Sequence, residues 1–100
     1  MKTLIINTSD NKRIEIALED GEKKYSLGKK VNRSEAQAAL SLIDSLLKKR
    51  KLSIHDINKI KVDKSNGSFT GIRIGLSIAN ALSFALNISV EIVDLTKALK

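Results

Sequence analysis

A strand, a long helix and a second strand follow one another in the second half of the chain, and this succession constrains the fold more than any other feature. The runs KIKVD (Lys59–Asp63) and ISVEIVD (Ile88–Asp94) are rich in β-branched residues, and the mostly apolar segment between them is long enough for a helix of several turns. Two strands joined by a crossover helix pair in parallel, with a right-handed connection. The second half therefore predicts the parallel part of a sheet.

The first third of the chain predicts an antiparallel β-meander. TLIIN (Thr3–Asn7), RIEIAL (Arg13–Leu18) and KKYSLG (Lys23–Gly28) each suit a strand, and the second of them alternates apolar with polar residues. TSDN, after the first strand, has the composition of a turn. Asp20-Gly21 is a strong hairpin signal between the second and third strands.

The middle of the chain predicts a first helix. Its expected start is a capping box made by Ser34 and Gln37, with Glu35 near the positive end of the helix dipole. The basic run from Lys48 to Lys51 falls at the C-terminal end, where cations are favourable. Between them, apolar residues recur at helical spacing: Ala36, Ala39, Leu40, Ile43 and Leu47.

Two shorter segments complete the predicted order of elements. LSIHDIN predicts a single helical turn, with Ser53 as its cap and Asp56 at the capping-box position. His55 lies in this turn without a second metal-ligating partner, which favours a surface residue. LTKALK (Leu95–Lys100) predicts a short terminal helix. The fold class is therefore α/β, with a five-stranded mixed sheet in the order βββ-α-β-α-β-α.

Length and composition place residues 1–100 in a single domain. The absence of cysteine excludes a disulfide framework and a thiolate metal site, and it suits a reducing cytoplasm. The opening MKTLIINTSDNK is too short an apolar run for a secretory signal. No apolar stretch reaches the roughly 18 residues of a membrane span. We therefore expect a cytoplasmic protein.

The formal net charge of +7 raises the possibility of nucleic-acid binding. Lys23, Lys24, Lys29 and Lys30 would grip the phosphates in such a small RNA-binding module. Aromatic residues make up only 3% of the chain, so base stacking is a weak basis for it. The second basic run, from Lys48 to Lys51, is explained by its place at a helix end.

The long second helix carries a wider apolar arc than one sheet contact requires. Gly71, Gly75 and Ala79 are spaced four apart, so they form a line of small residues along one side of this helix. Such a line is tolerated most readily where another backbone packs closely against the helix. The apolar surface that the sheet leaves uncovered could be buried by the first helix or by a partner molecule. If a partner buries it, the predicted interface residues on the two helices are Gly71, Ile72, Ile74, Gly75, Ile78, Ala79 and Leu82, joined by Leu42, Ser45 and Leu46.

The loop before this helix resembles a phosphate-binding glycine loop only in part. SNGSFTG lacks the spacing and the lysine of a P-loop, and it is not a dinucleotide fingerprint. A turn at Gly67, a helix cap at Ser68 or Thr70 and a hydrophobic plug at Phe69 explain the same residues. We therefore predict a structural loop, and no bound cofactor or metal.

The run GSFTGIRIGLSIANALSFALNISVEIVDLTKAL resembles the N-terminal domain of the TsaB (YeaZ) family, whose hallmark is a GPGSFTGLRIG-type segment. LIINTS resembles that family's opening LAIDTS, and the segment LSLIDSLLKKRKLSIHDINKIKV is also similar. The resemblance covers essentially the whole chain. It implies a ribonuclease-H-like domain of the actin-like ATPase superfamily.

The resemblance also implies a function. Members of this family support the threonylcarbamoyladenosine modification of tRNA as non-catalytic partners of the paralogous TsaD transferase, and a TsaE-type ATPase joins the complex. Helices of the N-terminal domains pack together in the heterodimer. A homodimer through the same surface is the alternative without the modification role, with concentration-dependent sedimentation as its test. On this basis, Ala79→Arg is expected to abolish the complex and leave the monomer folded.

Three departures from the family pattern bear on catalysis. We expect the family's usual C-terminal domain to be absent, because it would begin where the sequence ends at Lys100; the Asp of the first strand is replaced by Asn7, and Ser65-Asn66 replaces a Gly-Pro. An enzymatic alternative would use Glu35, Asp63 and Asp94 as a metal cluster, and Asn7 removes the carboxylate expected on its central strand. The expected protein is not an enzyme.

Overall fold

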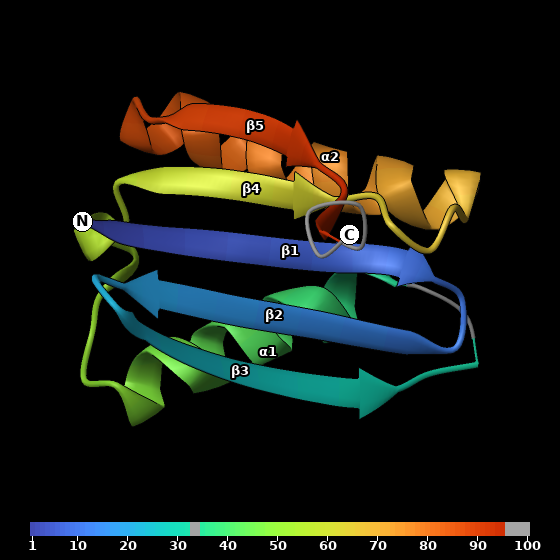
Figure 1. Cartoon of the computed structure of the whole chain (residues 1–100), viewed down its shortest axis with the longest axis horizontal. Helices are drawn as coiled ribbons and strands as arrows, with labels where there is room; N and C mark the ends of the chain where they lie inside the picture. The colour runs from blue at the N-terminus through green and yellow to red at the C-terminus, as the bar shows by residue number, and fades with distance from the viewer. Residues whose placement is uncertain (33–34, 96–100) are drawn as a thin grey trace.

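The computed structural model describes residues 1–32 and 35–95, and a five-stranded sheet forms its centre (Figure 1). The strands follow the predicted order along the chain, and the final predicted helix lies, apart from Leu95, outside the described residues. The elements are β1 (Lys2–Asp10), β2 (Arg13–Asp20), β3 (Lys23–Lys30), α1 (Ala36–Lys49), a 3-10 turn (Ile54–Asp56), β4 (Lys59–Asp63), α2 (Phe69–Leu86) and β5 (Ser89–Val93).

The sheet is mixed, as predicted, with strand order β3-β2-β1-β4-β5. β1 pairs antiparallel with β2 and parallel with β4, and β4 pairs parallel with β5. The first strand of the chain therefore lies at the centre. It joins the β-meander to the strand–helix–strand unit.

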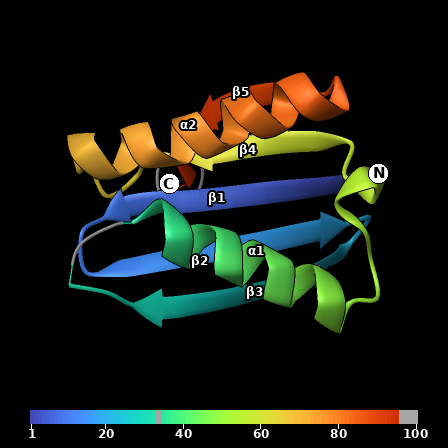
Figure 2. The ribbon, with the colours of Figure 1, turned by 180° about the vertical axis from the view of Figure 1, so that it is seen from behind.

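Both helices lie on one face of the sheet (Figure 2). α1 packs over β2 and β3, and α2 packs over β1 and β4. Alternate residues of each strand point to this face, so one set of side chains fills the space beneath the helices. The fully buried members of this set are Leu4, Ile6, Ile14, Ile16, Leu18, Ile60 and Val62.

The predicted turn TSDN is wrong, because β1 continues through Asp10 and the turn falls at Asn11 and Lys12. Contacts with the start of α2 hold this extra length in the extended state. Thr8 Oγ1 donates a hydrogen bond to the carbonyl oxygen of Gly71, and the backbone N–H of Ser68 donates to Ser9 O at 2.9 Å. The local turn composition is overridden by partners about sixty residues away.

The ends of the helical segments follow the predicted chemistry in part. Ser53 and Asp56 form the predicted capping box of the 3-10 turn, and His55 is exposed. α1 begins after Glu35, which acts as N-cap without a side-chain hydrogen bond. The predicted cap Ser34 lies outside the described residues. At the other end, Lys48 and the following residue place positive charge in the last turn, as predicted.

Candidate partner-binding surface on the two helices

The small-residue line of α2 faces the sheet of its own chain. Gly71, Gly75 and Ala79 are all buried there. A Cβ atom added at Gly75 would lie 2.7 Å from Thr8 Oγ1 and 3.5 Å from a side-chain carbon of Val62. The absence of side chains along this line therefore lets the helix approach β1 and β4. The backbone expected close to this line is that of the chain's own sheet.

Half of the predicted interface residues are consequently core residues of the monomer. They are Leu46 of α1 and Gly71, Gly75, Ile78 and Ala79 of α2. Ala79 is completely inaccessible, so an arginine there would bury an unpaired charge and destabilise the fold. The expectation that Ala79→Arg leaves the monomer folded is therefore wrong.

The other two predicted residues of α1, Leu42 and Ser45, lie on the side of the helix turned away from α2. Ala36 lines a pocket together with α2 residues, whereas Ala38 lines one with the end of β3. Residues four apart share a helix face, so Leu40 follows Ala36 toward α2, and Leu42 follows Ala38 toward β3. Ser45 is exposed next to that second flank. Leu40, which the helical spacing placed with the buried stripe of α1, is instead 46% exposed and lies on the side toward α2.

The outer side of α2 carries apolar side chains in contact with solvent. Only four of its 18 residues are buried, and Phe84 is 92% exposed. The helix has the length and mean hydropathy of a membrane span, contrary to the expectation from the sequence. Its sheet contacts and its polar outer residues, Arg73 and Asn80, are those of a helix packed on a protein domain.

One arc of α2 starts beside the first residue of α1 and continues by helical spacing along the outer side of α2. We call this arc, with Ala36 and Leu40 of α1, the two-helix face. Between the first residue of α1 and the N-terminal half of α2 lies an open pocket of about 370 Å³, and Arg73 adds a cation to its lining. Ile74 is the predicted interface residue found here; Ile72 lies on the opposite flank and Leu82 toward the sheet, both half-buried. The two-helix face consists of Ala36, Leu40, Thr70, Ile74, Ser77, Ala81, Phe84 and Ala85.

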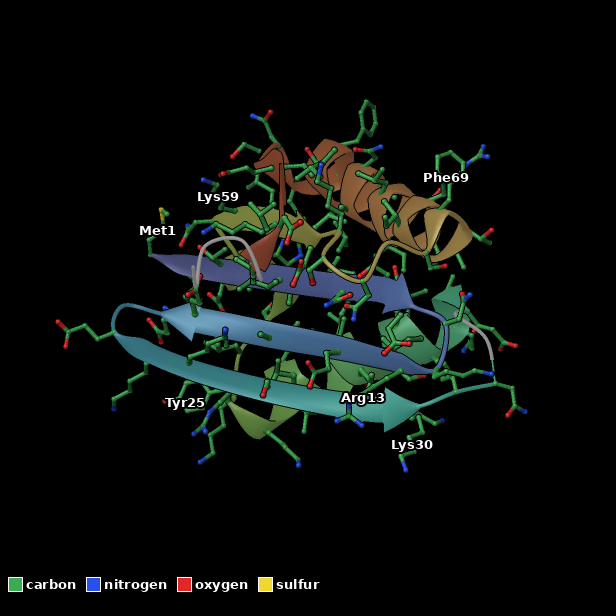
Figure 3. All side chains as sticks on the ribbon, turned by 45° about the vertical axis from the view of Figure 1, so that its right-hand side comes forward. Met1, Arg13, Tyr25, Lys30, Lys59 and Phe69 are labelled. Atoms are coloured by element: carbon green, nitrogen blue, oxygen red, sulfur yellow. The ribbon has the colours of Figure 1, made fainter. Side chains whose placement is uncertain are left out.

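The loop before α2 has the predicted structural role in two respects and differs in a third. Gly67 adopts φ +80°, which favours glycine. The Ser68 hydroxyl accepts a hydrogen bond from the Gly71 N–H at 3.3 Å and caps the helix. Phe69, however, is 74% exposed and points away from the domain (Figure 3), so it is not a plug. The Arg73 guanidinium lies 5.7 Å from its ring centroid.

A polar cluster links the ends of β1 and β4. Asn7 Nδ2 donates to Asp63 Oδ2 and to Asn66 Oδ1, each at 3.3 Å, and Asn7 Oδ1 accepts from Ser9 Oγ at 2.6 Å. Asp63 Oδ1 accepts from the Ser65 N–H at 3.0 Å. Asn7 thus acts as a donor toward the carboxylate of Asp63. Within residues 1–32 and 35–95, no three His, Cys, Asp or Glu side chains lie close enough to hold a metal ion.

The opposite face of the sheet is charged. Lys59 Nζ lies 2.5 Å from Glu91 Oε2, and Lys61 Nζ lies 4.0 Å from Glu19 Oε1. The hydrogen bond and positive charge of Lys59 lower the pKa of the Glu91 carboxyl. The two faces therefore differ in kind, since apolar surface is concentrated on the helix side.

Comparison with known proteins decides the family. The family model described as "TsaD: tRNA N6-adenosine threonylcarbamoyltransferase" matches residues 28–99. The chain belongs to this family. This agrees with the TsaB (YeaZ) resemblance of the sequence, because five curated relatives carry the name "tRNA threonylcarbamoyladenosine biosynthesis protein TsaB".

The relatives are similar across most of this chain but are themselves longer. The TsaB of Buchnera aphidicola subsp. Baizongia pistaciae is 32% identical over 88 residues, which are 88% of this chain and 40% of the relative. The TsaB of Bacillus subtilis (strain 168) is 33% identical over 64 residues, or 64% of this chain and 28% of the relative. This family member thus spans less than half the length of either.

A solved structure confirms the fold class. "YeaZ from Pseudomonas aeruginosa" superposes with a TM-score of 0.84 at 27% identity, over 93% of this chain and 43% of that one. The α/β domain of the ribonuclease-H-like and actin-like type is therefore the fold of this family member.

Proposed function

We propose that the chain is a non-catalytic scaffold subunit that pairs with a TsaD-type transferase in the threonylcarbamoyladenosine modification of tRNA. The observation that carries this proposal is the exposed apolar surface of the two-helix face. Family membership supplies the reaction, and the names of the TsaB relatives point to the same modification. A TsaE-type ATPase in the larger complex and a cytoplasmic location belong to the same proposal.

The two-helix face suits a partner with the same fold. Phe84 exposes nearly its whole side chain, and an aromatic residue of this kind contributes strongly to an interface when it becomes buried. A transferase whose family model matches this chain would carry two helices on the corresponding face. Two such faces can pack in the approximately two-fold arrangement of an isologous dimer.

The polar cluster supports the non-catalytic part of the proposal. Asn7 stands where the sequence resemblance expects an Asp, and its amide donates to Asp63 rather than adding a second carboxylate. The chemistry would then reside in the transferase subunit, and this chain would contribute binding surface. An activity of the isolated chain on tRNA would contradict this.

The test is complex formation with the host's TsaD-type transferase, measured by gel filtration and by the modification assay with and without this chain. Phe84→Arg and Leu40→Arg each place a charge on the two-helix face, and we expect a loss of affinity of at least about tenfold from each, which is about 1.4 kcal/mol. Ser45→Arg, on the far flank of α1, is the matched control and should leave the complex intact. Unchanged binding by Phe84→Arg and Leu40→Arg together would refute the docking surface.

A homodimer through the same face is the second candidate. Without a partner, burial of Phe84 and its neighbours in a second copy would remove the same apolar surface from water. Sedimentation of the purified chain distinguishes the two. A dimer that Phe84→Arg dissociates, combined with no binding to the transferase, would favour the homodimeric role.

A further inference from the structure

A basic groove lies at the end of β3, on the other side of the start of α1 from the two-helix face. Its volume is about 810 Å³, and it is open to solvent. It lies where the β1–β2 turn, the last residues of β3 and the start of α1 meet. Among the charged side chains that line it, four are cationic and two are acidic, a formal excess of two positive charges: Lys12, Arg13, Lys29, Lys30, Asp10 and Glu35.

The register of the sheet brings two of these cations, Arg13 and Lys30, to the same side of the sheet, while Lys29 points to the other side of β3. Arg13 and Lys30 are directly opposite each other in the β2–β3 pair, and both reach over the end of β3 (Figure 3). Like charges in this position repel and destabilise a sheet. Gly28 leaves room for the Arg13 guanidinium, because a Cβ atom at this position would overlap it where it lies.

Neighbouring carboxylates relieve this repulsion only in part. Arg13 Nε lies 3.6 Å from Glu15 Oε1. Within residues 1–32 and 35–95, Lys12, Lys29 and Lys30 form no ion pair. The groove therefore has unneutralised positive charge at its surface.

The other end of the same strand pair is arranged differently. Lys23 lies directly opposite Asp20, and Lys24 lies directly opposite Glu19. Lysines on an edge strand protect it from pairing with another sheet, and this accounts for lysine at both ends of β3. It does not account for Lys12 and Arg13, which come from other elements, or for the like-charge pair.

We propose that this groove binds the phosphate backbone of tRNA. The inference rests on the proposed function, which makes tRNA the substrate of the assembled complex. Long basic side chains from three segments around an open groove suit a chain of phosphates, whereas a single phosphate needs an enclosed site. Contacts of this kind position an RNA without reading its sequence. They also fit a chain with few aromatic side chains for base stacking.

The test compares two double variants of equal charge on the same strand. Lys29→Gln/Lys30→Gln removes two charges from the groove, and Lys23→Gln/Lys24→Gln removes two from the opposite end. Binding of a labelled, unmodified tRNA transcript to the purified chain is followed by fluorescence anisotropy across a salt series. We expect the groove variant to bind about tenfold or more weakly and to have a salt slope shallower by roughly 1.5, with the control within about twofold of the unaltered chain.

Thermal melting separates a binding defect from a folding defect. Because Lys30 faces Arg13, the groove variant should melt at or above the temperature of the unaltered chain. Inorganic phosphate, exchanged for chloride at equal ionic strength, tests the simpler ligand. A rise in melting temperature with phosphate but no binding of tRNA would overturn the RNA assignment in favour of a free anion.

Other outcomes also overturn the proposal. Equal losses in the two double variants would indicate a general charge effect, and binding that does not respond to salt would exclude phosphate contacts. Loss of the transferase complex, but not of tRNA, in the groove variant would assign the groove to a protein partner. If the transferase does not bind but tRNA binding still depends on Lys29 and Lys30, the proposed function fails and the RNA site stands.

Discussion

The α1 half and the α2 half of the domain share one sheet, but the outer surfaces of their helices differ in composition. α1, over β2 and β3, buries a single apolar stripe and presents polar and charged residues to water, including an ion pair between Asp44 and Lys48 at 2.9 Å. α2, over β1 and β4, buries small residues beneath it and exposes Phe69 and Phe84. The α2 half therefore leaves most of the apolar surface to solvent, and α1 adds Leu40 beside it.

This difference teaches where the stability of the monomer comes from. A side chain such as Phe84 is exposed in both the folded and the unfolded chain, so it contributes little to folding. Its apolar area becomes stabilising only when a partner covers it, at roughly 25 cal/mol per Å². The inner side of α2 stabilises the monomer itself, because the small residues Gly75 and Ala79 let the helix pack closely on the sheet.

The largest expected effect tests the two sides of α2 against each other. Gly75→Leu forces a side chain into the space occupied by Thr8 Oγ1 and Val62, and we expect a loss of about 3 kcal/mol in the free energy of unfolding. Ala81→Leu, on the outer side, should stay within about 0.5 kcal/mol. Urea unfolding followed by circular dichroism measures both. A comparable loss from Ala81→Leu would show that the outer side is packed, and the contrast would be lost.

The junction between the halves gives the next largest effect. Asn7→Asp replaces an amide donor by a carboxylate that faces Asp63, and we expect a loss of about 1–3 kcal/mol at neutral pH. Protonation removes this repulsion, so the difference from the unaltered chain should shrink as the pH falls below the carboxylate range. Asn58→Asp is the control, because Asn58 Oδ1 accepts a hydrogen bond from the Lys2 N–H that a carboxylate also accepts.

A smaller effect is expected on the outer surface of α1. Asp44→Ala removes the ion pair with Lys48, four residues apart on an exposed helix, and should cost about 0.3–0.5 kcal/mol. Salt should weaken the effect further. Thermal melts at low and high salt measure it, with Asp44→Glu as the control. A loss above about 1.5 kcal/mol would place this surface among packed structure rather than in solvent.

The smallest effect concerns the edge strand of the α2 half. Lys59 lowers the pKa of Glu91, so the ion pair stabilises the fold above the ordinary carboxylate pKa, and this contribution is lost as the pH falls through the lowered value. The melting temperatures of the unaltered chain and of Glu91→Gln should therefore differ at neutral pH and converge in acid. A difference that grows in acid would contradict the sign.

Most of the elements could be predicted from the sequence because their signals are local. Alternation identified β2, the capping box of Ser53 and Asp56 identified the 3-10 turn, and the crossover rule gave the parallel pairing of β4 and β5. The extension of β1 escaped prediction because it depends on Thr8 meeting Gly71, 63 residues later.

The docking surface was predicted less well, for a physical reason. Periodicity shows how much of a helix is apolar, but not which part of the arc meets the sheet. A line of glycines admits a close backbone on either side, and only the contact of Gly75 with β1 decides between the sheet and a partner. The flank of α1 that carries Leu40 depends equally on where α2 lies.

The central position of β1 has a consequence for how the domain assembles. The two hairpins of the β-meander pair residues that are near one another in the chain. The other edge of β1 pairs with β4, Lys59–Asp63, which is far away in the sequence. Pairing between strands so far apart in the sequence slows folding, because closing the intervening loop costs conformational entropy before the contact forms. During synthesis, β1, β2 and β3 leave the ribosome before β4, so this edge of β1 has no partner strand until Lys59–Asp63 follow.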